Sequence, residues 1–73
     1  MYFMDLEKIL IKHAPNTRPC GIRNIEAIQE IKNESGLNDS ALAEALNELP
    51  YVSTVGGSNE IASIELDEGF PTK

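Results

Sequence analysis

Apolar residues near the start of the chain recur at intervals of three and four, the spacing of one face of an α-helix. They are Leu6, Ile9 and Leu10, and His13 continues the same face. Lys12 near the end of this segment suits the negative end of a helix dipole, and Pro15 stops the pattern. We therefore expect a first helix within residues 1–14, followed by a connector over 16–21 that contains proline and glycine.

A second helix is predicted to begin after Asn24, because asparagine is a favourable N-cap residue. Ile25, Ile28 and Ile31 follow at intervals of three, so we expect them on one buried face. Gly36 is typical of the position just after a helix, where the backbone turns left-handed. The second helix therefore ends just before Gly36.

A third helix is predicted over residues 40–49, after a run of capping residues at 38–40. Its apolar face is formed by Leu42, Ala45, Leu46 and Leu49. Pro50 ends it, because proline cannot continue a helical hydrogen-bond pattern.

After Pro50 the apolar period changes from 3.6 to 2, which predicts strands. Residues 51–55 are rich in β-branched side chains, and 56–59 form a glycine-rich turn. In the return strand Ala62, Ile64 and Leu66 alternate with polar residues. We expect one domain over 1–73, with an ordered core at about 3–67 and a frayed C-terminal tail at 68–73.

The predicted core consists of one apolar face from each helix and the inward residues of the hairpin. These are Leu6, Ile9, Leu10, Ile25, Ile28, Ile31, Leu42, Leu46, Leu49, Val52, Ile64 and Leu66. The order is three helices followed by a β-hairpin, an α+β arrangement.

Residues 25–40 resemble a helix-turn-helix, with Gly36 in the turn and Leu37 plugging it. Residues 42–49, followed by Tyr51-Val52 and a Gly-Gly hairpin, resemble the third helix and the wing of a winged-helix domain. The resemblance to the winged helix-turn-helix superfamily spans residues 4–67 and is one of pattern, without a diagnostic motif. It implies a winged-helix-like fold and, as the usual function, DNA binding by the third helix and wing.

The charge distribution argues against that usual function. Twelve acidic and six basic residues give a net charge of −6. Residues 1–23 carry +2, whereas residues 24–73 carry −8 with only Lys32 and Lys73 as bases. A DNA reader needs cations to neutralise phosphates. We therefore expect an acidic partner-binding surface on the third helix and wing, formed by Asp39, Glu44, Asn47, Glu48, Glu60 and Glu65.

No catalytic, cofactor or metal site is predicted. Cys20 lies between Arg18 and Arg23 but has no resolving cysteine, and His13 is the only histidine. Gly56-Gly57 joins two strands and is not a phosphate loop. No apolar run approaches the roughly 20 residues of a membrane span, and one cysteine fits a reducing, cytoplasmic compartment.

The sequence thus favours a small, acidic protein-binding regulator or inhibitor without enzymatic activity. Its partner would be a basic protein surface, in the transcription machinery or on a nucleic-acid-binding protein, and phage-encoded proteins offer an analogy. The alternative is a winged-helix DNA-binding regulator that uses Ser40 and Asn47. A positive rim would assist it, formed by Lys8, Lys12, Arg18 and Arg23. The partner's identity and the oligomeric state stay open.

Overall fold

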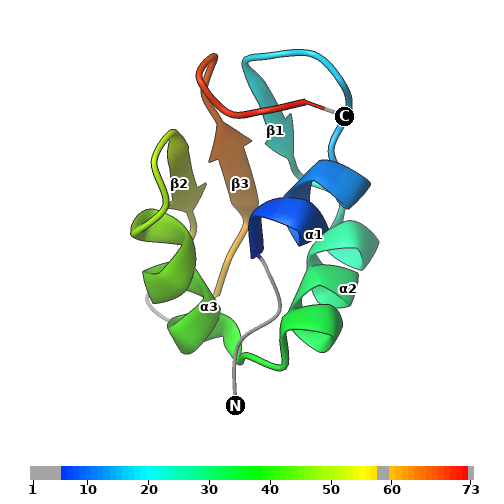
Figure 1. Cartoon of the computed structure of the whole chain (residues 1–73). Helices are drawn as coiled ribbons and strands as arrows, with labels where there is room; N and C mark the ends of the chain where they lie inside the picture. Colours follow the sequence, from blue (N-terminus) through cyan, green and yellow to red (C-terminus); the bar gives the residue numbers. More distant parts are fainter. Residues whose placement is uncertain (1–5, 58–59, 73) are drawn as a thin grey trace.

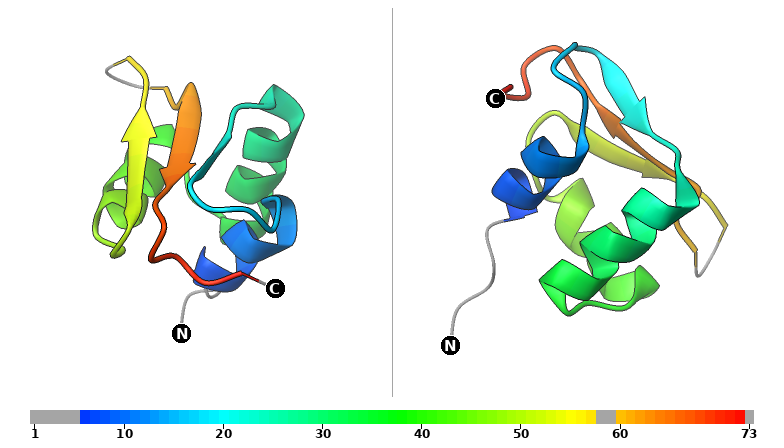
Figure 2. Two further views of the ribbon diagram at one scale, coloured as in Figure 1. Left: turned by 90° about the horizontal axis from the view of Figure 1, so that it is seen from above. Right: turned by 90° about the vertical axis from the view of Figure 1, so that its right-hand side faces the viewer.

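The computed structural model describes residues 6–57 and 60–72, and these form an α+β fold of three helices and one antiparallel sheet (Figure 1). In chain order the elements are α1 (Leu6–His13), β1 (Cys20–Ile22), α2 (Ile25–Ser35), α3 (Asp39–Asn47), β2 (Val52–Val55) and β3 (Ser63–Leu66). The sheet order is β1-β3-β2. All three helices lie on one side of the sheet, so its opposite side faces solvent (Figure 2). The predicted α+β class is confirmed.

The predicted helix ends agree closely with the structure. The Asn24 side chain accepts hydrogen bonds from the Glu26 and Ala27 amides, and Gly36 has a φ of 72°. Asn38 caps α3 by accepting from the Ala41 amide at 2.8 Å. The third helix therefore begins one residue earlier and ends two residues earlier than predicted. Of the predicted first helix, residues 1–5 lie outside the described part of the chain. None of the helices described is long and apolar enough to cross a membrane.

The prediction missed β1, which lies within and just after the expected connector and places a strand between α1 and α2. Its three residues pair with β3, so that Cys20 faces Leu66 and Ile22 faces Ile64. A Cys-Gly-Ile segment next to proline has no strand periodicity of its own. It is a strand only because β3, more than forty residues later in the chain, supplies the hydrogen-bonding partner. The element order therefore differs from three helices followed by a hairpin.

Most of the predicted core is confirmed, with one clear exception. Leu10, Ile31, Leu42, Leu46, Ile64 and Leu66 are fully buried, Leu6 and Leu49 pack against them in part, and Ile25 is 81% exposed. Successive residues of an α-helix advance by about 100°, so each three-residue step falls about 60° short of a full turn. Ile25 therefore lies about 120° from Ile31 around α2, and only Ile28 and Ile31 reach the core.

The C-terminal segment is part of the core, which corrects the prediction of a frayed tail after residue 67. Phe70 is only 3% exposed. The Arg18 guanidinium lies 5.4 Å from its ring and donates hydrogen bonds to the backbone oxygens of Phe70 and Pro71. The Tyr51 ring covers Gly69 so closely that a side chain there would collide with it. The C-terminal segment thus runs beside the loop before β1 (Figure 1), and its Phe70 side chain packs into the core.

The hairpin departs from simple alternation at its far end. Ile61 is buried and Ala62 exposed, the reverse of the expected face, and the connection between β2 and β3 is longer than the predicted turn. Part of that turn, residues 58–59, lies outside the described residues. From Ile64 to Leu66 the expected alternation holds, because those two side chains meet the helices.

Candidate functional site

Two of the six predicted partner-binding residues stand on the outer face of α3. Glu44 and Glu48, the C-cap residue, are exposed and one helical turn apart, and their carboxylates make no hydrogen bond or ion pair with any described residue. Leu42 and Leu46 hold the opposite face of the helix in the core. Burial of that face fixes the rotation of α3 about its axis, so both carboxylates project into solvent at a defined spacing.

Asp39, at the start of α3, is used inside the fold. Its Oδ1 accepts a hydrogen bond from Lys32 Nζ at 2.6 Å, and both side chains are about three-quarters buried. This hydrogen bond holds the pKa of Asp39 below its ordinary value, and the backbone amide of Ile61 adds to the effect. Asp39 therefore joins α2 and the hairpin to α3, and its charge is largely matched by Lys32.

Glu65 lies on the solvent side of the sheet and is also matched by a cation. Its carboxylate accepts a hydrogen bond from Arg23 at 3.1 Å and another from the Ser63 hydroxyl at 2.9 Å. The Arg23 side chain reaches it by folding over Gly21, where a Cβ would lie 2.9 Å from the guanidinium. Glu60 differs from Glu65, because it is exposed and has no partner among the described residues.

Asn47 forms a bridge between α3 and the edge of the sheet. Its Oδ1 accepts from the Thr54 backbone amide at 3.2 Å, and its Nδ2 donates to the Thr54 hydroxyl at 3.1 Å. Since β2 is an edge strand, the Thr54 amide would otherwise point to solvent. Asn47 is thus engaged within the fold at the end of the acidic helix.

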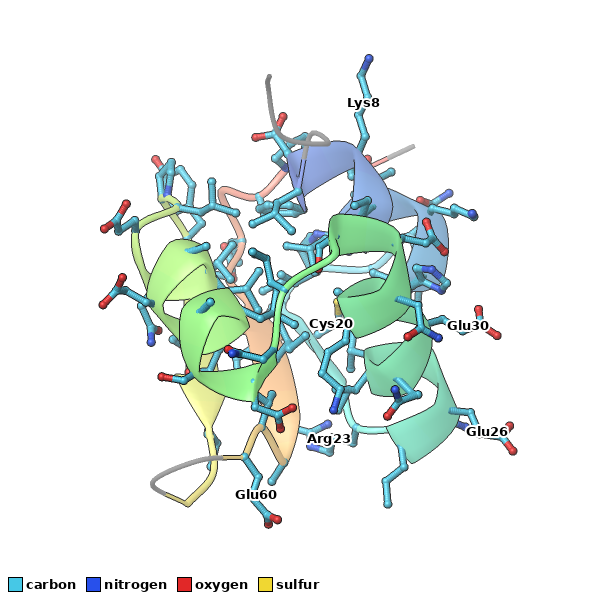
Figure 3. All side chains as sticks on the ribbon, turned by 90° about the horizontal axis from the view of Figure 1, so that it is seen from below. Lys8, Cys20, Arg23, Glu26, Glu30 and Glu60 are labelled. Carbon is cyan, nitrogen blue, oxygen red and sulfur yellow. The ribbon has the colours of Figure 1, made fainter. Side chains whose placement is uncertain are left out.

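The basic residues of the proposed positive rim are also largely engaged. Lys12 pairs with Glu34 at 3.2 Å, and Arg23 pairs with Glu65. The Arg18 guanidinium donates to four backbone oxygens, those of Pro15, Thr17, Phe70 and Pro71. Among the described members of the rim only Lys8 is exposed without a partner, and it lies at the opposite end of the molecule from Glu60 (Figure 3).

His13 belongs to a charged cluster that the sequence did not reveal. Its Nε2 lies 2.9 Å from Glu34, its Nδ1 lies 3.8 Å from Glu30, and the possible metal-ligating atoms of the three residues lie within 4.8 Å of one another. Lys12 Nζ, however, lies 3.2 Å from both carboxylate oxygens of Glu34. A cation of the chain already neutralises this carboxylate, and the cluster serves as a contact between α1 and α2.

Cys20 is half-buried in β1, and its sulfur accepts a hydrogen bond from the Arg18 guanidinium at 3.3 Å. No histidine or carboxylate among the described residues is bonded to this thiol. Arg18 donates to two carbonyl oxygens of the C-terminal segment and to two of the loop before β1, so the contact with Cys20 forms part of the link between these segments.

A groove of about 390 Å³ between α2 and the far end of the hairpin was not expected from the sequence. Asp39 and Glu60 both line it, so the structure brings these two predicted residues together, whereas Glu44 and Glu48 lie elsewhere on α3. Exposed Ile25 lines its α2 wall. The sequence did not predict an exposed Ile25, because the spacing of Ile25, Ile28 and Ile31 favoured burial of all three.

Comparison of this chain with protein-family models, with curated protein sequences and with solved structures gave no match.

Proposed function

We propose that this chain is a small regulator or inhibitor that binds a basic surface of another protein through α3 and the hairpin. One observation carries the proposal. Glu44, Glu48 and Glu60 have no cationic partner among the described residues, whereas most of the described cations are engaged within the fold. The charge that is free to meet a partner is therefore negative.

The position of these carboxylates suits recognition of a cationic surface. Glu44 and Glu48 lie on a helix whose other face is buried, so little conformational freedom would be lost on binding. Exposed charges of one sign chiefly raise the rate of association with an oppositely charged partner. Nucleic-acid-binding proteins and the transcription machinery carry such surfaces, and this acidic face would imitate the charge of their DNA.

The second candidate is a winged-helix DNA-binding regulator. The order α2, short connection, α3 and hairpin supports it, because a helix-turn-helix places its second helix in the major groove. The charges count against it. On α3 the described acidic residues are Asp39 and Glu44, with Glu48 at its C-terminal end, and residues 38–67 contain no lysine or arginine. Asn47, one of its two proposed base-reading residues, is bonded to Thr54.

The experiment starts with affinity purification of a partner from the native cell. The purified partner is then titrated with wild-type protein and with a Glu44→Lys/Glu48→Lys variant, and the association rate is measured at several salt concentrations. Because the reversal places like charges opposite one another, association with a basic partner should slow by about tenfold or more and its salt dependence should weaken. A Glu26→Lys/Glu68→Lys variant is the matched control, since both side chains are exposed and the reversal changes the net charge equally on other faces.

Titration of the same proteins with duplex DNA separates the two candidates. Wild-type protein should show no shift of DNA at about 150 mM salt, because it lacks the phosphate-neutralising cations. Under the DNA hypothesis the α3 reversal would instead strengthen an already measurable affinity. Micromolar or tighter DNA binding by wild-type protein would refute the protein-binding proposal.

A further inference from the structure

The groove between α2 and the hairpin joins an apolar surface to a free negative charge. Ile28 and Ile61 form buried parts of its wall, and Ile25 stands at its edge with 81% of its surface exposed. Three large hydrophobic residues are exposed in the described part of the chain, and Ile25 has the largest exposed fraction. The other two are Tyr51 and Val55, and neither lines this groove.

The two cations of the groove are already paired within the chain. Arg23 donates to Glu65 on the sheet, and Lys32 donates to Asp39 at the start of α3. Glu60 has no described partner and lies on the hairpin side, whereas Arg23 lies between the hairpin and α2 (Figure 3). An anionic ligand would have to break an existing ion pair, but a cation can pair with Glu60 directly.

We infer that this groove receives a segment of the partner protein in which a large aliphatic side chain lies beside a lysine or arginine. The aliphatic side chain packs against Ile25, Ile28 and Ile61, and the cation pairs with Glu60. Apolar contact at the centre and a charge pair at the rim is the usual composition of a protein interface. The inference rests on the proposed function and extends it, because it adds a second contact region to the acidic face of α3.

The test uses a phage library of random 12-residue peptides, selected on the immobilised wild-type protein. Selected peptides should be enriched in leucine, isoleucine or phenylalanine next to lysine or arginine. Their affinity should fall at least about tenfold for Ile25→Asn, because the main apolar contact is lost. It should fall by about two- to fivefold for Glu60→Gln, an exposed charge pair.

Two variants outside the groove serve as matched controls. Val55→Asn removes another exposed aliphatic side chain, and Glu68→Gln removes another exposed carboxylate; both should bind the peptides as wild type does. All four variants change exposed side chains, so their circular dichroism spectra should match that of the wild type. Failure of the library to enrich any peptide would overturn the inference. So would enrichment of acidic sequences, self-association of the chain through Ile25, or equal binding to Ile25→Asn.

Failure of this inference is distinguishable from failure of the proposed function. If the α3 reversal weakens binding of the purified partner but Ile25→Asn does not, the acidic face stands and the groove is not a docking site. If the groove selects its peptides but the α3 reversal leaves partner binding unchanged, the function assigned to α3 fails instead.

Discussion

Carboxylates on the α1–α2 side of the molecule and on the outer face of α3 have opposite surroundings. Glu34 on α2 meets Lys12 and His13 of α1, and these contacts fasten one helix to the other. Glu44 and Glu48 on α3 meet no cation in the described chain. The same residue type therefore serves cohesion on one side and is available for recognition on the other. Composition alone does not distinguish the two roles.

Neither set of carboxylates contributes much to the stability of the fold. Exposed ion pairs contribute about 0–1 kcal/mol each, whereas burial of a large apolar side chain contributes about 1.5–3 kcal/mol. Both sides of the molecule therefore depend on the shared apolar core. The clearest way to weaken either side is to truncate a core residue that belongs to it.

The largest expected effect is that of Phe70→Ala, on the side closed by the C-terminal segment. Loss of this buried ring should lower the free energy of unfolding by about 3–5 kcal/mol. Leu46→Ala, on the α3 side, should cost about 2–5 kcal/mol. Either loss is a large part of the roughly 4–11 kcal/mol expected for a domain of this length. Urea unfolding at pH 7 measures both.

Large and nearly equal losses of unfolding free energy in the two variants would show that both sides of the molecule share one core. An unchanged urea midpoint for Phe70→Ala would contradict burial of the C-terminal segment. An unchanged midpoint for Leu46→Ala would contradict the orientation of α3, and with it the outward direction of Glu44 and Glu48.

The sequence predicted best what local periodicity and capping determine. Asn24, Gly36 and Asn38 act on their immediate neighbours, so the bounds of α2 and the start of α3 could be predicted to within one residue. Phe70 and β1 could not be predicted in this way. Their burial and pairing depend on contacts with residues about fifty and forty positions away, which no local pattern contains.

The candidate site was predictable to a smaller extent. The exposure of Glu44 and Glu48 follows from the apolar face of α3 and was expected. Which charges remain unpaired depends on tertiary contacts. The sequence therefore could not predict the ion pairs of Asp39 with Lys32 and of Glu65 with Arg23. Asn47 shows the same limit, because its partner Thr54 belongs to another element.

Asn47→Ala should have an intermediate effect and sharpens the comparison on the α3 side. The substitution removes two hydrogen bonds and leaves the Thr54 amide of the edge strand without its partner. The free energy of unfolding should fall by about 0.5–1.5 kcal/mol, and hydrogen exchange at Thr54 should accelerate. Asn47→Asp is the control, because it keeps an acceptor for the amide. Equal exchange rates of the Thr54 amide in wild type and Asn47→Ala would show that Asn47 does not bind Thr54 and is free to contact a partner.

The smallest expected effect is a pH dependence of stability that arises from the paired carboxylates of Glu34 and Asp39. Hydrogen bonds from His13 and then Lys12 hold the pKa of Glu34 below its ordinary value of 4.5, and the bond from Lys32 holds the pKa of Asp39 below 3.8. Because the folded chain then binds these protons less readily than the unfolded chain, the stabilisation is present above the ordinary values. It is lost as the pH falls through the lowered ones.

Urea midpoints measured from pH 7 to pH 2 test this directly. Wild-type stability should decline below about pH 4.5, and Glu34→Gln and Asp39→Asn should each make that decline shallower, since neither variant carboxamide can titrate. A decline as steep in Glu34→Gln and Asp39→Asn as in wild type would mean that neither carboxylate is held by its cation, and it would remove the contrast with the unpaired carboxylates of α3 on which the acidic recognition face depends.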